Sequence, residues 1–210
     1  MKFAEQLAAC KVLPVVTAHD VDTTVALAHA LARAGMTAIE ITLRTEAAID
    51  SLRAVKEAVP QLVVAAGTVT NARDVQRAVS AGADFCVSPG ISAALLEAAA
   101  AENVRFLPGV ATASEILLGM AHGIDIFKLF PAVPVGGVEL LKAFRGPFPA
   151  IRFCPTGGLT RDNLPHFLAL PNVICCGGSW MVSDALVRAG DWEQIERLAR
   201  DAMSVDGHRD

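Results

Sequence analysis

The sequence predicts an α/β fold in which short strands and helices alternate along the whole chain. Runs rich in β-branched and aromatic residues recur between alanine-rich stretches of helical period, and eight such pairs follow one another at even spacing. That alternation is typical of a parallel sheet built from βα units. The 210 residues, of which 53% are hydrophobic, suffice for one domain with a substantial core. We therefore expect residues 1–210 to form a single (β/α)8 TIM barrel, with residues 1–10 as an extra N-terminal helix.

Eight short runs supply the expected strands. The first reads Val-Leu-Pro-Val-Val-Thr and the second Ala-Ile-Glu-Ile-Thr-Leu, and every later run also contains Val, Ile or Phe, the residue types that favour strands. In chain order, the strands are expected at 12–17, 38–43, 62–66, 85–88, 105–108, 125–130, 151–154 and 173–176.

A stretch of helical period follows each of these strands, and the helices are expected at 21–34, 45–58, 71–81, 92–102, 113–121, 137–144, 161–169 and 181–200. We expect the last helix to break near Gly190. Thr45, Asn71, Ser92 and Ser114 stand at helix starts and are expected to cap them. An open, doubly wound sheet is the alternative arrangement, but the turn after the first strand lacks the glycine-rich nucleotide fingerprint that such a sheet often carries.

Charge and cysteine usage argue against several classes of protein. The net charge is −4 and neither Lys nor Arg forms a run, so we expect no surface for nucleic acid or for an anionic membrane. Five cysteines without a CxxC spacing indicate reduced core thiols of a cytoplasmic protein. Residues 1–10 lack the features of a signal peptide, and no stretch is apolar enough to cross a membrane. The five scattered histidines show no ligand spacing, so we expect no metal.

One lysine, Lys128, stands inside the apolar run Ile-Asp-Ile-Phe-Lys-Leu-Phe-Pro at 124–131, whereas the other four lysines lie in polar surroundings. Burial favours the neutral amine of a lysine, and a neutral amine can attack a carbonyl carbon. A structural lysine, with a packed stem and a head that reaches a polar end, is the other interpretation. The run by itself leaves both open.

The alternation along the second strand predicts which side chains face inward. Ile39, Ile41 and Leu43 share the face that meets the helices, so Glu40 and Arg44 project into the barrel, with Arg44 nearer the C-terminal rim. By the same rule Lys128 faces inward with Ile126 and Phe130. These ionisable groups are interpreted either as a buried structural ion pair or as the elements of an active site, and burial of several charges in one interior favours function.

Two glycine pairs end the last two predicted strands, Gly157-Gly158 and Gly177-Gly178. Glycine lets backbone N–H groups approach an anion, and the loops after strands seven and eight of such barrels are a common phosphate site. We therefore expect a phosphate group there, although a glycine pair can also serve only to make a tight turn. The Ser88-Pro89-Gly90 segment after the fourth strand is interpreted first as a turn alone, and a place at the mouth of the site is the second interpretation.

Six segments together resemble the family of 2-keto-3-deoxy-6-phosphogluconate (KDPG) aldolase, also called 4-hydroxy-2-oxoglutarate (KHG) aldolase. They are Glu40-Ile-Thr-Leu-Arg44-Thr, Gly67-Thr68-Val, Ser88-Pro89-Gly90, Phe127-Lys128-Leu-Phe130-Pro131, Arg152-Phe-Cys-Pro-Thr156-Gly157-Gly158 and Gly177-Gly178-Ser179-Trp180. The resemblance runs in order across nearly the whole chain. It implies a cofactor-free class I aldolase of the Entner-Doudoroff pathway, a (β/α)8 barrel that assembles as a homotrimer.

The resemblance also implies a role for each matching residue. Lys128 forms the Schiff base and Glu40 shuttles protons, Arg44 and Thr68 bind the substrate carboxylate, and Pro89 and Phe130 line the site. Gly157, Gly158, Gly178 and Ser179 hold the phosphate, and Thr156 bears on stereoselectivity at the hydroxyl-bearing carbon. The expected reaction cleaves the phosphorylated 2-keto acid to pyruvate and D-glyceraldehyde 3-phosphate, with 4-hydroxy-2-oxoglutarate as a second substrate.

Three alternatives stay open at the level of sequence. The substrate can be the galactonate epimer of the same phosphorylated acid, although Thr156 favours the gluconate epimer. The chain can also be a phosphosugar-binding barrel without lyase activity, in which Lys128 only pairs with Glu40. The third alternative is a metal-free phosphosugar isomerase or epimerase that uses Glu40 to abstract a proton.

Overall fold

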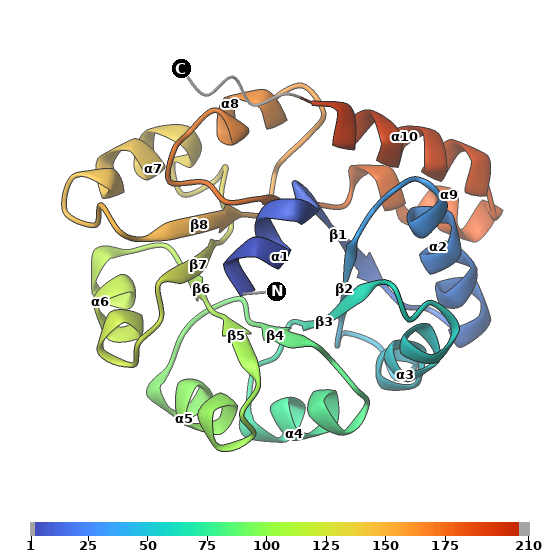
Figure 1. The fold of residues 1–210 in the computed structure, drawn as a ribbon, viewed down its shortest axis with the longest axis horizontal. Coiled ribbons are helices and arrows are strands. Elements are labelled where there is room, and N and C mark those ends of the chain that lie inside the picture. The colour runs from blue at the N-terminus through green and yellow to red at the C-terminus, as the bar shows by residue number, and fades with distance from the viewer. Residues whose placement is uncertain (1–2, 206–210) are drawn as a thin grey trace.

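The computed structural model describes residues 3–205 and shows a ring of outer helices around parallel strands, with helix α1 in the middle of the ring (Figure 1). The strands are β1 Val12–Thr17, β2 Ala38–Thr42, β3 Val63–Gly67, β4 Phe85–Val87, β5 Arg105–Leu107, β6 Gly109–Val110, β7 Ile126–Leu129, β8 Arg152–Pro155 and β9 Cys176–Gly178. The α-helices are α1 Phe3–Cys10, α2 Val21–Arg33, α3 Ala48–Ala58, α4 Ala72–Ser80, α5 Ala93–Ala101, α6 Ala113–Ala121, α7 Gly137–Arg145, α8 Leu164–Leu168, α9 Asp184–Ala189 and α10 Trp192–Ser204, with a 3-10 helix η1 at Trp180–Val182. The predicted α/β class and the extra N-terminal helix are confirmed.

Backbone hydrogen bonds divide the strands between two parallel sheets. A six-stranded sheet has the order β5-β4-β3-β2-β1-β9, and a three-stranded sheet has the order β6-β7-β8. The division falls at Pro108, the single residue between β5 and β6, which has no N–H to continue the ladder. The expected strand at 105–108 is therefore followed by a short strand, β6, that the sequence did not predict. On the other side, isolated bridges Phe153↔Val173 and Thr156↔Gly177 connect β8 to the segment of β9.

The C-terminal third departs most from the predicted boundaries. The expected strand at 173–176 is displaced to Cys176–Gly178, with Val173 left as an isolated bridge. The expected helix at 181–200 consists of η1, α9 and α10, and α9 ends before Gly190, whose φ of 64° lies in the left-handed region. The predicted break at Gly190 is confirmed, whereas the expected helix at 161–169 shortens to Leu164–Leu168.

Two of the four predicted helix caps are confirmed. Asn71 and Ser92 each accept a hydrogen bond from the backbone N–H three residues later. The prediction for Ser114 was wrong, because Thr112 caps α6 in a capping box and Ser114 lies inside the helix. Thr45 was also wrong as a cap, since its hydroxyl donates to a carbonyl of the loop after β1 and α3 begins without a side-chain cap.

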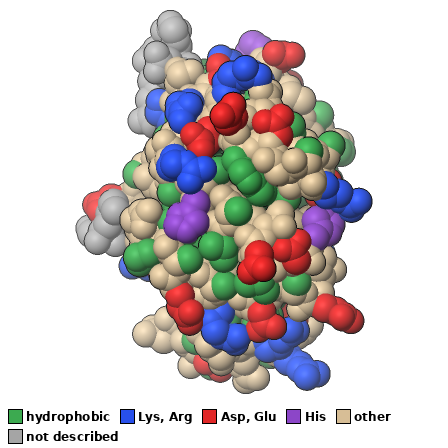
Figure 2. Space-filling view, turned by 90° about the vertical axis from the view of Figure 1, so that its right-hand side faces the viewer, with side chains coloured by type: hydrophobic (Ala, Val, Ile, Leu, Met, Phe, Trp, Pro, Cys, Tyr) green, Lys and Arg blue, Asp and Glu red, His purple; other side chains and the backbone are tan. Residues whose placement is uncertain are grey.

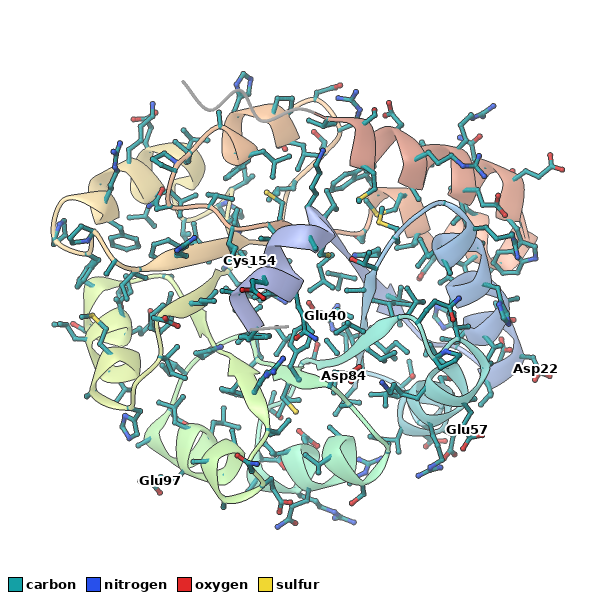
Figure 3. All side chains as sticks on the ribbon, in the orientation of Figure 1. Asp22, Glu40, Glu57, Asp84, Glu97 and Cys154 are labelled. Atoms are coloured by element: carbon teal, nitrogen blue, oxygen red, sulfur yellow. The ribbon has the colours of Figure 1, made fainter. Side chains whose placement is uncertain are left out.

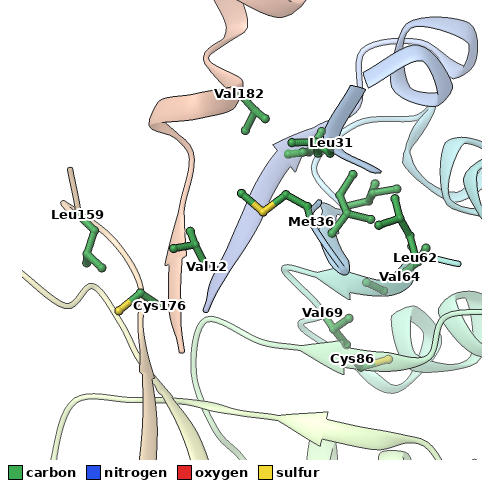
Figure 4. Packing of buried hydrophobic residues seen from close by; sticks show 14 of the residues in the cluster. Val12, Leu31, Met36, Leu62, Val64, Val69, Cys86, Leu159, Cys176 and Val182 are labelled. Atoms are coloured by element: carbon green, nitrogen blue, oxygen red, sulfur yellow. The ribbon is translucent and has the colours of Figure 1, made fainter. Parts of the chain in front are cut away.

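The apolar residues form two cores on opposite faces of the strands. Ile39 and Ile41 belong to the larger core between the strands and the outer helices, part of which is seen close by in Figure 4. The smaller core fills the inside of the ring, and α1 closes it with Leu7 and Cys10. Its other buried members are Leu13, Ala38, Ala65, Phe85, Val87, Leu107, Ile126, Cys154, Ile174 and Cys175. Within residues 3–205, no helix has the length and hydrophobicity needed to span a bilayer.

Candidate active site

A lysine and a glutamate from distant strands meet inside the ring. Lys128 of β7 and Glu40 of β2 lie 88 positions apart, yet Lys128 Nζ donates to Glu40 Oε1 at 3.0 Å and to Oε2 at 3.3 Å. The two residues are 5% and 1% exposed. Figure 3 shows Glu40 near the middle of the ring, whereas Asp22, Glu57 and Glu97 lie on its outer edge. The inward orientation predicted from strand alternation is confirmed for both residues.

Gly67 makes room for this pair. It ends β3, beside Glu40, and a Cβ atom at its position would meet the Glu40 carboxylate and lie 2.7 Å from Glu40 Cγ. The ring centroid of Phe130 lies 5.3 Å from Lys128 Nζ, within the range of a cation–π contact. The ammonium and carboxylate are therefore held in one position by each other, by a glycine and by an aromatic ring.

The strand that carries Lys128 is positioned by the turn that contains Pro89. Lys128 N donates to the Pro108 carbonyl at 2.9 Å, and Gly109 is its register partner. A Cβ atom at Gly109 would collide with the Pro89 carbonyl, so only glycine lets the two segments pack this closely. Pro89 thus contacts the neighbour of the Lys128 strand. Pro89 itself does not line the cavity at the carboxyl ends of the strands.

Arg44 and Thr68 are also brought together. Arg44 Nε donates to Thr68 Oγ1 at 3.1 Å, across the ends of β2 and β3. Thr68 has a φ of 59°, a left-handed conformation that a β-branched residue rarely adopts. The strained backbone turns the threonine hydroxyl toward the guanidinium. This leaves most of the guanidinium N–H groups for another partner, and a planar fork suits a carboxylate.

A cavity of about 500 Å³ opens at the carboxyl ends of the strands. It contains seven of the predicted site residues, Arg44, Phe130, Thr156, Gly157, Gly158, Gly178 and Ser179. Lys128 and Glu40 do not line it, but Lys128 contacts the ring of Phe130, which does. Thr68 joins it only through Arg44. The buried ion pair and the open cavity are therefore adjacent parts of one site.

The glycine pairs at this rim serve two different needs. Gly157 and Gly158 have φ values of 101° and 80°, which side chains other than glycine rarely adopt. Gly177 and Gly178 are instead required by space. A Cβ atom at Gly177 would meet the Thr156 hydroxyl, and one at Gly178 would enter the ring of Trp180. Both pairs leave bare backbone facing the cavity, as an anion site requires.

Sequence reasoning missed several residues that line the cavity. These are Val15, Thr17, Leu159, Trp180, Val182, Ser183 and Asp184, whereas Gly177 belongs to a glycine pair that the sequence predicted. Val15 and Thr17 lie on β1, and the others lie in the segments that come after β8 and β9. The carboxyl ends of parallel strands converge on one rim, which was the signal available in the sequence. The sequence holds no such signal for Asp184, because this residue begins a short helix whose position depends on the packing of η1 and α10.

The thiols take no part in this site. All five cysteines are free and buried. Burial raises the pKa of Cys86 to about 12 and also raises the pKa values of Cys10 and Cys176, which keeps these thiols protonated. Among the described residues, no group of histidine, cysteine and acidic side chains is arranged to hold a metal ion. Cys154 belongs to the inner apolar core, as predicted, and Figure 3 shows it near the centre of the ring.

The surface in Figure 2 carries acidic and basic side chains side by side, without a broad area of one sign. Charged side chains elsewhere in the described residues are paired, as Arg33 and Arg200 are with Glu196 and Arg53 is with Asp50. The arrangement is that of an ordinary solvated surface.

Comparison with known proteins places this site in a family. The family model of KDPG and KHG aldolase matches residues 3–198. The chain is 50% identical over 193 residues to 2-dehydro-3-deoxy-phosphogluconate aldolase of Pseudomonas aeruginosa, covering 92% of this chain and 88% of the relative. It is 44% identical to the KHG/KDPG aldolase of Escherichia coli K12, covering 91% and 90%. It superimposes on the KDPG aldolase of Legionella pneumophila, crystallised with pyruvate as a covalent carbinolamine, with a TM-score of 0.93 at 38% identity, covering 96% and 98%.

Proposed function

Because the chain belongs to the KDPG and KHG aldolase family, we propose that it cleaves 2-dehydro-3-deoxy-6-phosphogluconate to pyruvate and D-glyceraldehyde 3-phosphate as a class I aldolase. The observation that carries this proposal is the buried contact of 3.0 Å between Lys128 Nζ and Glu40 Oε1 beside the rim cavity. A lysine next to a carboxylate that can accept its proton is suited to attack a ketone. The covalent pyruvate adduct captured in the Legionella relative supports the same chemistry.

In the proposed reaction, the neutral amine of Lys128 adds to C2 of the keto acid, and loss of water gives an iminium. The iminium withdraws electrons from the C3–C4 bond. Glu40, directly or through a water molecule, removes the proton of the C4 hydroxyl as the aldehyde departs, and the electrons of the broken bond form an enamine. Glu40 then returns a proton to C3, and hydrolysis of the iminium releases pyruvate and regenerates Lys128.

The remaining residues orient the substrate in this proposal. Arg44 binds the carboxylate through two parallel N–H donors, and Thr68 holds the guanidinium by the hydrogen bond of 3.1 Å. The backbone of Gly157, Gly158 and Gly178, with the Ser179 hydroxyl, receives the phosphate in the cavity that Arg44 also lines. Thr156 lines the same cavity and, in this proposal, contacts the C4 hydroxyl and thereby bears on which epimer reacts.

Cleavage of 4-hydroxy-2-oxoglutarate to pyruvate and glyoxylate is part of the proposal. This substrate has the same keto acid end but no phosphate, so it needs Lys128, Glu40 and Arg44 alone. The Escherichia coli relative is named for both substrates, KHG and KDPG.

Borohydride reduction in the presence of pyruvate tests the proposal. Reduction traps an iminium as a stable amine, and peptide mass mapping is expected to locate the adduct on Lys128. Absence of an adduct from the wild-type chain under turnover conditions would exclude the Schiff-base mechanism and leave the binding-protein or isomerase alternatives. Product analysis with the gluconate and galactonate epimers then identifies the preferred substrate.

Glu40→Gln tests the acid–base role separately. We expect the variant to form the borohydride-trapped adduct but to exchange the methyl protons of pyruvate with D2O far more slowly than wild type. NMR measures that exchange, and a rate equal to that of wild type would remove Glu40 from its role.

We also infer that the two sheets close into one (β/α)8 barrel that forms a single domain. Only Pro108 separates β5 from β6, and the Thr156↔Gly177 bridge connects β8 to β9, so the ring has no long unpaired edge. At each boundary between the two sheets, a run of backbone hydrogen bonds between neighbouring strands is missing, while the polypeptide itself is continuous.

A homotrimeric, cytoplasmic enzyme completes the proposal. Leu117 and Met120 of α6 are 56% and 43% exposed, and apolar side chains of this kind are commonly covered in an assembly. Five free thiols suit a reducing compartment. Light scattering coupled to size-exclusion chromatography is expected to give three times the chain mass, and a monomer mass would contradict the trimer.

A further inference from the structure

A carboxylate lines the cavity in which a phosphate is expected to bind. Among the described residues that line this cavity, Arg44 is the one basic side chain and Asp184 is the one acidic side chain. Asp184 shares the cavity with Gly178 and Ser179, the proposed phosphate ligands, and follows Ser183, whose side chain makes no capping hydrogen bond. An acid in this position would oppose a phosphate by like-charge repulsion unless another group cancelled its charge.

The imidazole of His19 is placed to offset the negative charge of the Asp184 carboxylate. Its Nε2 lies 3.3 Å from Asp184 Oδ1, and the two side chains are 32% and 59% exposed. His19 belongs to the loop after β1 and Asp184 begins α9 after β9, so the pair connects the rim of two neighbouring strands. Asp20, the adjacent acid, is engaged elsewhere, because its carboxylate accepts from Thr23 N at 2.8 Å as the cap of α2.

The charge of the substrate makes this pair consequential. A phosphate monoester carries about −1.5 to −2 charges at neutral pH, in addition to the carboxylate at the other end of the substrate. The positive charge of Arg44 offsets that of the substrate carboxylate, and the charges of the buried Lys128 and Glu40 offset each other. The phosphate end then has only backbone and hydroxyl donors. Asp184 alone makes this end negative, and the imidazole of His19, 3.3 Å from that carboxylate, offsets its charge whenever both ring nitrogens carry a proton.

We infer that His19 and Asp184 form a charge-balancing pair that determines how strongly this site prefers phosphorylated over unphosphorylated 2-keto acids. This inference rests on the proposed aldolase function. Asp184 fixes the imidazole at the mouth, and the imidazole keeps the carboxylate from opposing the phosphate. The pair acts on substrate choice, and the carbon–carbon bond cleavage at Lys128 does not depend on it.

Steady-state kinetics of four proteins with two substrates test this inference. The proteins are wild type, His19→Ala, Asp184→Asn and the double variant, and the substrates are 2-dehydro-3-deoxy-6-phosphogluconate and 4-hydroxy-2-oxoglutarate. His19→Ala is expected to lower kcat/KM for the phosphorylated substrate by about three- to tenfold at low salt, mainly through KM, and by less at 0.5 M salt because ions screen exposed charges. Asp184→Asn in the His19→Ala background is expected to restore kcat/KM to within about twofold of wild type.

Activity toward the unphosphorylated substrate serves as the internal control, and all four proteins are expected to agree within about twofold. His29→Ala, a histidine on the outer surface of α2, is the matched control and is expected to match wild type with both substrates. Equal losses with both substrates, or no rescue by Asp184→Asn, would overturn the inference and assign the pair a purely structural role. Failure of the wild-type chain to produce pyruvate from either substrate would instead refute the proposed function.

Discussion

The two ends of the ring interior differ in composition, closure and consequence. At the amino ends of the strands the interior is filled by apolar side chains such as Leu13 and Phe85, and α1 covers it with Leu7. At the carboxyl ends it holds the ion pair of Lys128 and Glu40 and opens into the cavity. The first end is apolar and closed, whereas the second is charged and open, a separation that is common where helices surround parallel strands.

The apolar end and the charged end of the interior are separated by only two residues along a strand. Four inward residues of the inner core are each followed two positions later by a residue of the site, namely Ala38 by Glu40, Ala65 by Gly67, Ile126 by Lys128 and Cys154 by Thr156. Two residues along a strand cover about 6.6 Å. The apolar layer therefore lies directly under the charged layer and supports it, which explains how an ammonium and a carboxylate stay in fixed positions inside a small domain.

Loss of the amine should have the largest effect on the reactive end. We expect Lys128→Ala to lower pyruvate formation by at least about a thousandfold, because no other nucleophile stands at this position. Removing one partner of a buried ion pair also costs about 3–5 kcal/mol, so unfolding in urea should be measured alongside. Lys128→Met, which keeps more of the side-chain volume, separates the two effects. Turnover within tenfold of wild type in a folded variant would contradict the assignment.

Loss of the aromatic ring at the closed end should reverse that pattern. Phe85 is 1% exposed, and its ring contacts that of Phe3 with centroids 5.2 Å apart. Phe85→Ala is expected to lower the free energy of unfolding by about 3–5 kcal/mol through a buried cavity. We expect kcat per folded molecule to stay within about twofold of wild type, because this residue does not reach the charged layer. A large fall in kcat with little loss of stability would show that the two ends are not separable.

Gly67→Ala tests the boundary itself. The added Cβ would meet the Glu40 carboxylate, so the variant should lose about 1–3 kcal/mol of stability from overpacking and also lose proton exchange on pyruvate as Glu40 is displaced. Gly146→Ala is the matched control, because a Cβ there meets its nearest atom at an ordinary 3.8 Å. If Gly67→Ala and Gly146→Ala have the same kinetics, Gly67 has no part in positioning Glu40.

Helix caps on the outer ring should give the smallest effect. Asn71 accepts a hydrogen bond from Asp74 N at 3.0 Å, and Asn71→Ala is expected to cost about 1 kcal/mol of stability without a change in kcat. Ser114→Ala should cost less than about 0.5 kcal/mol, since Thr112 is the cap of α6. Thermal unfolding of both variants measures the difference, and equal costs would argue against the assigned caps.

Local pattern was sufficient for most of the inner and outer faces. Alternation at 38–44 identified Ile39 and Ile41 as outward and Glu40 as inward, because a strand has only two faces and the apolar one must meet the helices. The same rule placed Lys128. Cap residues were predicted less reliably, because a hydroxyl can also bond to a group far away in the chain, as at Thr45, which donates to a carbonyl of another loop.

The amino-acid sequence by itself determined the alternating α/β pattern, the inward direction of Lys128 and Glu40 and the glycine pairs at one rim. Only the tertiary structure decided that these two side chains lie 3.0 Å apart, that Pro108 divides the sheets, and that Asp184 and His19 meet at the mouth. The physical reason is the range of the interactions. Strand and turn preferences act over a few residues, whereas the spacing of two strand ends depends on the packing of the whole ring between them.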